Sequence, residues 1–215
     1  MNGMYKMNKN SFLLVRDIVV MLLATISFSI AVTVNCTPLY KWFVTHYHLA
    51  HLVNLSSAEL MSNYQNLLKY LNCFWIHSWK RTIPASHAGL VHFSDVKGLI
   101  QINWLILLIS GIGAVYLIKK RMQHHQMWQL VIPLQFLGMT VLGLIFILIA
   151  DFENIFLKFH QIAFSNQDWL FNPKTDPIIN ALPPEFFEAC ALNVLVVCII
   201  IGMLIYLLSK KELKK

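Results

Sequence analysis

Residues 130–150 read LVIPLQFLGMTVLGLIFILIA, a run of 21 residues without a charged side chain. A helix needs about 20 apolar residues to cross the ~30 Å hydrocarbon core of a bilayer. Three other windows have the same character, at about residues 18–35, 99–118 and 189–208. Because lipid cannot satisfy backbone N–H and C=O groups, each window is predicted to be a transmembrane helix.

The composition agrees with a membrane protein. Hydrophobic residues make up 57% of the 215 residues, and charged residues only 13%. A soluble domain carries about 25% charged residues, so a soluble globular class is excluded. We expect an all-α integral membrane protein, with residues 1–215 forming a single membrane domain built on a four-helix bundle.

Basic residues predict how this bundle is oriented. Ten of the 17 Lys and Arg residues lie in the two termini and the link between the second and third windows. They are Lys6, Lys9, Arg16, Lys119, Lys120, Arg121, Lys210, Lys211, Lys214 and Lys215. By the positive-inside rule both termini are cytoplasmic and the connections 37–98 and 151–188 face outward. The net charge of +7 therefore reflects multi-pass insertion in the cell membrane, and no nucleic-acid partner is expected.

The two outer connections are predicted to form a small extracellular cap. In the first, Ser56 and Glu59 form a capping box before a run of apolar residues at helical spacing, which predicts an interfacial amphipathic helix. In the second, aromatic and polar residues alternate and the prolines of NPKTDP and LPP interrupt any helix, which predicts a short ordered segment.

Several kinds of site are disfavoured. The sequence HYHLAH at 46–51 has no Cys or carboxylate at ligand spacing, so we expect no metal site. None of the nine His lies within a window, which argues against a haem held inside the bundle, and no acidic residue lies there either, which argues against ion transport. A disulfide between Cys36 and Cys73 is left open.

Three histidines fall at the outer edge of the bilayer. His87 and His92 precede the second window and His160 follows the third. Imidazole has an ordinary pKa near 6.5 and is suited to proton transfer. No GxSxG motif is present, although Ser94 and Lys97 fit the short pattern S-x-x-K.

Three segments resemble the lipoprotein intramolecular transacylase family, Lit, of low-GC Gram-positive bacteria. They are NYQNLLKYL (63–71), SHAGLVHFSDVKGLI (86–100) and FHQIAFSNQDWLFNPKTDPIINALPPEFF (159–187), in this order around the four windows. The third segment is long and specific, and the similarity covers essentially the whole chain.

This resemblance implies a reaction. Family members act on diacylglyceryl lipoproteins in the outer leaflet, moving the sn-2 acyl chain to the α-amino group of the modified N-terminal cysteine. Because an ester becomes an amide, neither ATP nor an acyl carrier is needed, and no cofactor is implied. The partners implied are the lipoprotein substrate and membrane lipid, and we expect a monomer.

The resemblance also implies site residues. His92 and His160 match the motifs and are expected to share general acid and base roles, with His87 a weaker candidate. Asp95 lies three residues after His92 on the same helix face and could orient its ring. Asn166, Asp168, Trp169 and Asp176 are expected either to position the substrate or to cap the loop.

Two other functions stay open from sequence. One is a membrane protein without enzymatic activity, whose cap binds another protein. The other is a lipid hydrolase or acyltransferase that uses Ser94 and Lys97. Acyl-chain preference, the route of the substrate into the site and the division of acid and base roles are not encoded in any recognisable pattern.

Overall fold

The computed structural model describes residues 9–213, and within this range the chain forms helices and loops without a strand. The helices are α1 (Lys9–Val34), α2 (Thr37–His46), α3 (Leu49–Leu52), α4 (Ser57–Asn72), α5 (His87–Gln123), the 3-10 turn η1 (Met127–Leu130), α6 (Val131–Ala150), α7 (Phe152–Ala163), α8 (Ile178–Ala181) and α9 (Pro184–Glu212). Four of them, α1, α5, η1–α6 and α9, are long and apolar enough to span a membrane. The predicted all-α membrane fold with four spanning helices is confirmed.

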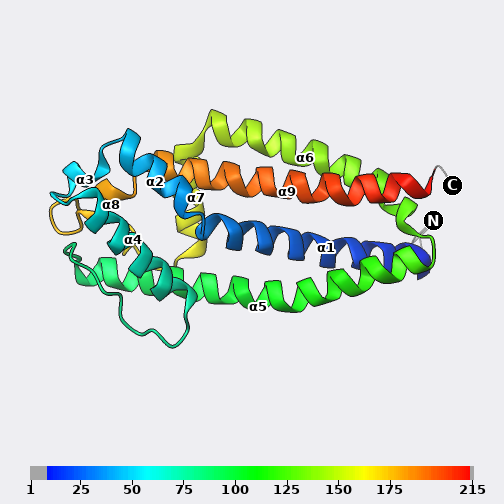
Figure 1. Cartoon of the computed structure of the whole chain (residues 1–215), viewed down its shortest axis with the longest axis horizontal. Coiled ribbons are helices and arrows are strands. Elements are labelled where there is room, and N and C mark those ends of the chain that lie inside the picture. Colours follow the sequence, from blue (N-terminus) through cyan, green and yellow to red (C-terminus); the bar gives the residue numbers. More distant parts are fainter. Residues whose placement is uncertain (1–8, 214–215) are drawn as a thin grey trace, which may run out of the picture.

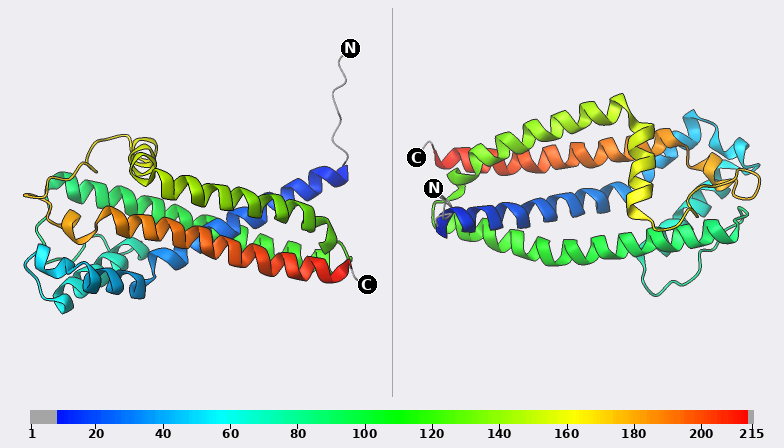
Figure 2. Two further views of the ribbon diagram at one scale, coloured as in Figure 1. Left: turned by 90° about the horizontal axis from the view of Figure 1, so that it is seen from above. Right: turned by 180° about the vertical axis from the view of Figure 1, so that it is seen from behind.

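These four helices form a row in the order α6, α9, α1, α5 (Figure 1). Helix α1 packs against both α5 and α9, and α9 packs against α6, so α5 and α6 stand at opposite edges. Helix α7 does not continue α6 but runs across the row toward α5 (Figure 2). The described ends of the chain lie together at one end of the row, and α2, α3, α4 and α8 form a cap at the other.

Polar side chains join the helices of the row within the membrane region. Asn103 of α5 donates a hydrogen bond to the Ser27 carbonyl of α1 (3.1 Å), and Asn193 of α9 donates to Thr33 Oγ1 (2.9 Å). Small and hydroxyl residues at such positions let helix backbones approach closely in lipid. The sequence SFSIAVTV at 27–34 therefore suits α1 to its place between two neighbours.

A buried ion pair closes the row at the end where the termini lie. Arg121 of α5 binds Asp17 of α1, with N–O distances of 2.8 and 3.0 Å, and both side chains are buried. Arg121 also donates to Gln126 O and Gln129 Oε1, which holds the link that follows α5. The basic residues Lys6, Lys214 and Lys215 of the predicted orientation signal lie outside the described residues.

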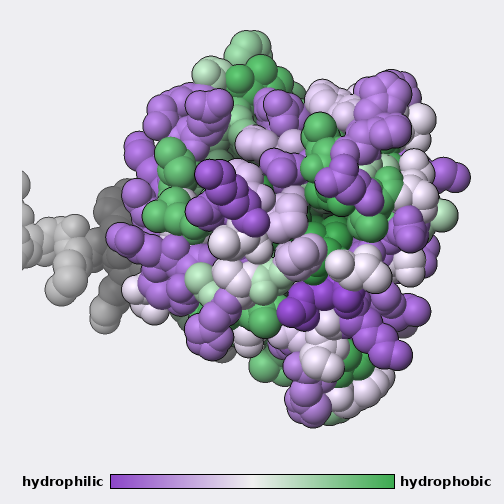
Figure 3. Space-filling model, turned by 90° about the vertical axis from the view of Figure 1, so that its left-hand side faces the viewer, coloured by the Kyte–Doolittle hydropathy of each residue, from purple (hydrophilic) through white to green (hydrophobic). Residues whose placement is uncertain are grey.

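The cap has a hydrophobic core of its own. The rings of Tyr40 and Tyr64 stack at 3.8 Å, Phe186 packs on their edges, and Tyr40 donates a hydrogen bond to the Ala181 carbonyl (2.9 Å). The Ser56–Glu59 capping box that starts α4 is present, and the apolar face of α4 is buried in this core. The amphipathic pattern of α4 thus serves packing between protein elements, and the surface at this end is mostly hydrophilic (Figure 3).

All four cysteines are free thiols, so the disulfide between Cys36 and Cys73 is not formed.

The ion pair generates a first prediction. Asp17→Asn leaves the buried Arg121 guanidinium without a counter-charge, which should lower the stability of the detergent-solubilised protein by about 3–5 kcal/mol. The double variant Asp17→Asn/Arg121→Met removes both charges and should recover a large part of this loss. Thermal unfolding followed by circular dichroism tests it, and a single variant as stable as the parent protein would show that the pair is not needed.

Candidate active site

His92 and His160 face each other at the junction of the row and the cap. The centroids of their rings lie 5.8 Å apart, and their exposed fractions are 7% and 8%. His92 lies on the part of α5 that extends beyond the apolar window 99–118, and His160 lies near the end of α7. Two side chains separated by 68 positions in the sequence are therefore brought into one site.

The path of α7 explains how His160 reaches this site. Asp151, with φ −153° and ψ 51°, interrupts the helix between α6 and α7, and its carboxylate accepts a hydrogen bond from Asn154 (2.7 Å). On α7, Phe156 and His160 are one turn apart on the face that points inward, with their rings 4.2 Å apart. Ile162, on the other side of the helix, is 87% exposed, and Phe159, whose ring lies 5.4 Å from the His160 ring, is 54% exposed.

Aromatic rings enclose the two imidazoles. Phe164 lies 4.8 Å from the His92 ring and 5.5 Å from the His160 ring, and Phe171 lies 5.4 Å from His92. The indole of Trp169 lies 5.0 Å from the His160 ring. This surrounding offers the rings little polar solvation, which favours neutral imidazoles.

Hydrogen bonding distinguishes the two rings. Nδ1 of His160 lies 2.7 Å from the Phe156 carbonyl, so Nδ1 must carry the proton and Nε2 the lone pair. Nδ1 of His92 is buried without a hydrogen-bond partner. An unpaired N–H is costlier to bury than an unpaired lone pair, and we therefore assign the His92 proton to Nε2.

The pKa values follow from the same environment. Burial lowers the pKa of His92 to about 4, helped by the neighbouring His160 and opposed by Asp95. Burial also lowers the pKa of His160, while its hydrogen bond to the Phe156 carbonyl acts in the opposite direction. Both rings are neutral at pH 7.

The loop after α7 is fastened to α5 by the residues predicted around the site. Asn166 donates through Nδ2 to Asp95 Oδ2 (2.9 Å), and Trp169 Nε1 donates to the Asn166 carbonyl (3.1 Å). Asn166 Oδ1 accepts from the backbone N–H of Asp168 (3.1 Å), which forms a turn. Asp95 thus binds Asn166 and makes no hydrogen bond to His92, in contrast to the orienting contact expected from the spacing.

Asp176 holds the beginning of α5. Its buried carboxylate accepts hydrogen bonds from the Ser86 backbone N–H (2.7 Å) and from Thr175 Oγ1 (2.8 Å). A Cβ at Gly89 would lie 2.4 Å from Asp176 Oδ1, so this close approach requires glycine. Sequence reasoning overlooked Gly89, although a glycine one turn before a candidate catalytic histidine was a usable signal.

The remaining candidates lie apart from the histidine pair. His87 is exposed at the first position of α5. Ser94 is exposed, and the Lys97 ammonium donates to the Ile76 carbonyl and lies 4.4 Å from the centre of the Tyr70 ring. Lys97 is therefore not directed at Ser94. No cluster of three or more metal-ligating side chains occurs among residues 9–213.

The fold and the site define a multi-pass membrane protein with a buried histidine pair at one end of its helical row. The family model described as lipoprotein intramolecular transacylase Lit matches residues 16–187. The chain belongs to this family and is a transferase, which confirms the resemblance drawn from its motifs.

Solved structures support the same conclusion. The membrane-integral lipoprotein intramolecular transacylase Lit from Bacillus cereus is 25% identical, with a TM-score of 0.79 over 93% of this chain and 96% of that chain. A variant of that protein with a histidine replaced by alanine is 26% identical, with a TM-score of 0.76 over 96% and 98% of the two chains. A comparison with curated protein sequences finds no match.

The contact between Gly89 and Asp176 leads to a second prediction. Gly89→Ala forces the start of α5 away from Asp176 and should destabilise the protein by about 1–3 kcal/mol. Gly98→Ala is the matched control, because a Cβ there meets open space and alanine favours the helix by up to about 1 kcal/mol. Melting temperatures of the two variants should shift in opposite directions. Equal shifts would mean that the close approach of Gly89 to Asp176 does not contribute to stability.

The low pKa of His92 leads to a third prediction. In the unfolded chain His92 becomes protonated near its ordinary pKa of about 6.5. In the folded protein it becomes protonated only near pH 4. Stability should therefore fall as the pH is lowered through this window and be unaffected by His92 above it. His92→Gln should flatten the dependence of the melting temperature on pH between these values, whereas His87→Gln, at an exposed position, should not. Parallel curves for all three proteins would contradict the assignment.

Proposed function

We propose that this chain moves the sn-2 acyl chain of a diacylglyceryl lipoprotein onto the α-amino group of its N-terminal cysteine, giving the lyso form. The observation that carries the proposal is the pair of buried, neutral imidazoles with complementary hydrogen-bonding states. One ring offers a lone pair and the other an N–H. At a substrate carbonyl placed between them, the first ring can accept a proton from the attacking amine and the second can donate a hydrogen bond to the carbonyl oxygen.

His160 is proposed as the proton carrier. Its Nε2 lone pair accepts a proton from the attacking amine as the new C–N bond forms, while the Phe156 carbonyl stabilises the charged ring through Nδ1. The same ring then returns the proton to the glycerol oxygen as the C–O bond breaks. The amine loses one proton and the glycerol hydroxyl gains it, so the transfer is balanced.

His92 is proposed as a neutral hydrogen-bond donor to the oxyanion of the tetrahedral intermediate. A ring whose pKa is about 4 and whose Nδ1 is buried does not carry the extra proton that a general acid would give away. Donating from the neutral state would leave an imidazolate, whereas polarising a carbonyl through Nε2–H does not. The two histidines thus differ in role, and one ring acts as base and acid in turn.

The location of the pair suits a substrate held in a membrane. We propose that the basic end of the row is cytoplasmic, so that the histidines lie at the extracellular face. Phe159 and Ile162, the exposed apolar residues of α7 near His160, would then contact outer-leaflet lipid within reach of the ester. Amine and ester belong to one molecule, so holding them in an attacking geometry can provide a large effective molarity without ATP. One chain supplies every residue of the site, and a monomer suffices.

The alternatives receive less support. A Ser94/Lys97 mechanism needs a short contact between these side chains, whereas Lys97 binds the Ile76 carbonyl. Two buried imidazoles with lowered pKa values reduce stability at acidic pH. A binding protein without activity would gain nothing in return for this loss, whereas an active site would.

Histidine substitutions provide the fourth prediction. His160→Ala removes the proton carrier and should reduce formation of the lyso lipoprotein by at least about 10²-fold. His92→Ala removes the oxyanion donor and should reduce it by roughly 10²–10³-fold. The measurement is mass spectrometry of the N-terminal peptide of one lipoprotein in a host that lacks the activity.

Two variants on α5 are the controls. His87→Ala changes the same residue type at an exposed position, and Ser94→Ala tests the serine mechanism; both should retain activity within about threefold, as surface changes usually do. Full activity of His160→Ala would refute the proposed chemistry, and a folded but inactive Ser94→Ala would favour the serine mechanism.

A further inference from the structure

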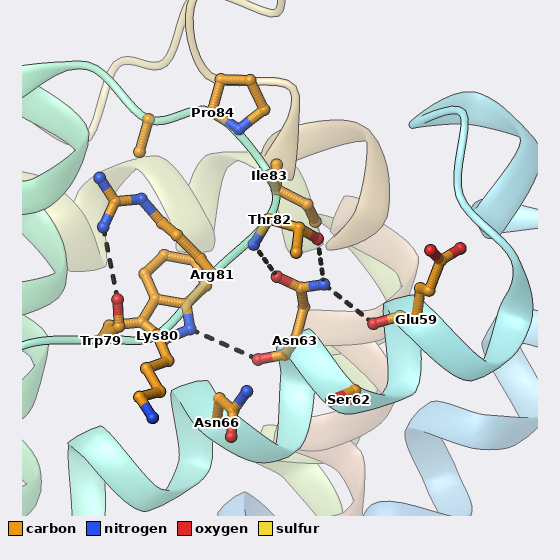
Figure 4. Close-up of a pocket in the computed structure, with 11 residues that line it drawn as sticks. Glu59, Ser62, Asn63, Asn66, Trp79, Lys80, Arg81, Thr82, Ile83 and Pro84 are labelled. Carbon is orange, nitrogen blue, oxygen red and sulfur yellow. Dashed lines mark hydrogen bonds between the residues drawn. The ribbon is translucent and has the colours of Figure 1, made fainter.

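A polar pocket of about 810 Å³ opens on the cap, and neither His92 nor His160 lines it. Helix α4 forms one wall and the connection from α4 to α5 forms the other (Figure 4). Asn63 joins the two walls, since its side chain donates to Thr82 Oγ1 (2.8 Å) and accepts from the Thr82 backbone N–H (2.8 Å). The two walls of the pocket are therefore joined by hydrogen bonds from the buried Asn63, and the connection is not a free loop.

Two cations of this pocket have no ionic partner. Lys80 and Arg81 are exposed, and within residues 9–213 neither forms a salt bridge. Glu59 also lines the pocket, but its carboxylate is bound to the backbone N–H and hydroxyl of Ser56 and points away from both cations (Figure 4). From Leu60 to Ser94 the sequence contains no Asp or Glu. The pocket is thus a positively charged site with amide and hydroxyl groups around it.

Contacts along α5 give the depth of this site relative to the membrane. Near the end of α4, Leu71 O accepts from Gln101 and Asn72 Oδ1 accepts from Trp104, which places these residues where the apolar window of α5 begins. Further along the connection, Trp79 packs on Phe93, with ring centroids 5.0 Å apart. Phe93 precedes Leu99 by six residues, or about 9 Å along a helix. Lys80 and Arg81 follow Trp79 and lie at the depth of a headgroup layer.

The connection from α4 to α5 begins with two aromatic residues, close to the apolar window of α5. Phe74 and Trp75 are 70% and 62% exposed and pack edge to face at 4.8 Å. Lys97 binds the carbonyl of Ile76 and so fixes this turn against α5. Exposed aromatic residues at the edge of the apolar region, followed outward by unpaired cations, match the layering of acyl chains and phosphates in a leaflet.

We propose that this pocket binds the phosphate headgroup of an anionic membrane lipid, with Phe74 and Trp75 lying among the acyl chains below it. Lys80 and Arg81 neutralise the phosphate, and Ser62 and Asn66 are placed to hydrogen-bond the polar part of the headgroup. The site is separate from the histidine pair, and it would exist even if the transacylase chemistry proposed above were wrong.

Native mass spectrometry of the full chain, released from a neutral detergent and titrated with phosphatidylglycerol or phosphatidylcholine, tests the proposal. One phosphatidylglycerol should bind more tightly than any phosphatidylcholine. Lys80→Gln/Arg81→Gln should weaken this binding roughly thirtyfold, as expected for the loss of two charges near a lipid surface. Lys158→Gln/Lys174→Gln removes the same charge from the other outward connection and should leave it unchanged. Equal weakening by both pairs would overturn the site, because general charge would then explain the binding.

Two further arms separate lipid from free phosphate and from peptide. Phe74→Ser/Trp75→Ser should also weaken phosphatidylglycerol binding, and excess glycerol phosphate should not displace the lipid. Normal lipid binding by the aromatic variant, together with displacement by glycerol phosphate, would reduce the site to one for free phosphate. Unchanged lipid binding by Lys80→Gln/Arg81→Gln with slower turnover of a lipoprotein would assign the pocket to the peptide part of the substrate. Either result would overturn the lipid assignment.

Discussion

The crossing of α7 over the helix row is the constraint on which the site depends. The bilayer forces the spanning segments to be helices, and their packing places α5 and α6 at opposite edges of the row. Had the chain after α6 continued straight outward, His160 would be separated from His92 by the width of α1 and α9. The interruption at Asp151 turns the chain across the row, and His160 and Phe164 then contact His92 of α5. A bend at one residue thus converts two distant segments into one site.

Desolvation is the second condition of the proposed chemistry. Aromatic rings from α7, its following loop and α5 exclude water from the two imidazoles, and this keeps them neutral. Nδ1 of His92 has no hydrogen-bond partner, whereas Nδ1 of His160 binds the Phe156 carbonyl, so the two neutral rings differ in tautomer. The polar residues around the site stabilise this enclosure: Asn166 binds Asp95 and ties the loop to α5, and Asp176 holds the start of α5. Positioning of the histidines, more than added reactive groups, is what the surrounding polar residues provide.

The hydrophobic windows and the Ser56–Glu59 box allowed the spanning helices and the start of α4 to be predicted, because these signals are local in the sequence. The histidine pair could be singled out through motif resemblance and shared depth in the membrane. The crossing of α7, the outward extension of α5 to His87 and the close approach at Gly89 were not predicted, since each depends on contacts between distant segments. Helix spacing alone suggested that Asp95 would orient the ring of His92. Its actual partner, Asn166, lies 71 positions away in the sequence.

The central claim is that the pair catalyses the direct transfer of an acyl chain between two groups of one substrate molecule, and an isotope experiment tests it most directly. Purified enzyme would receive two lipoprotein populations, one with a labelled sn-2 acyl chain and the other with a labelled peptide, and the N-terminal peptides would be read by tandem mass spectrometry. We expect the acyl label in the amide of unlabelled peptides only, with the glycerol left as the monoacyl thioether. Products that carry both labels, or an amide formed from the sn-1 chain, would contradict the proposed transfer.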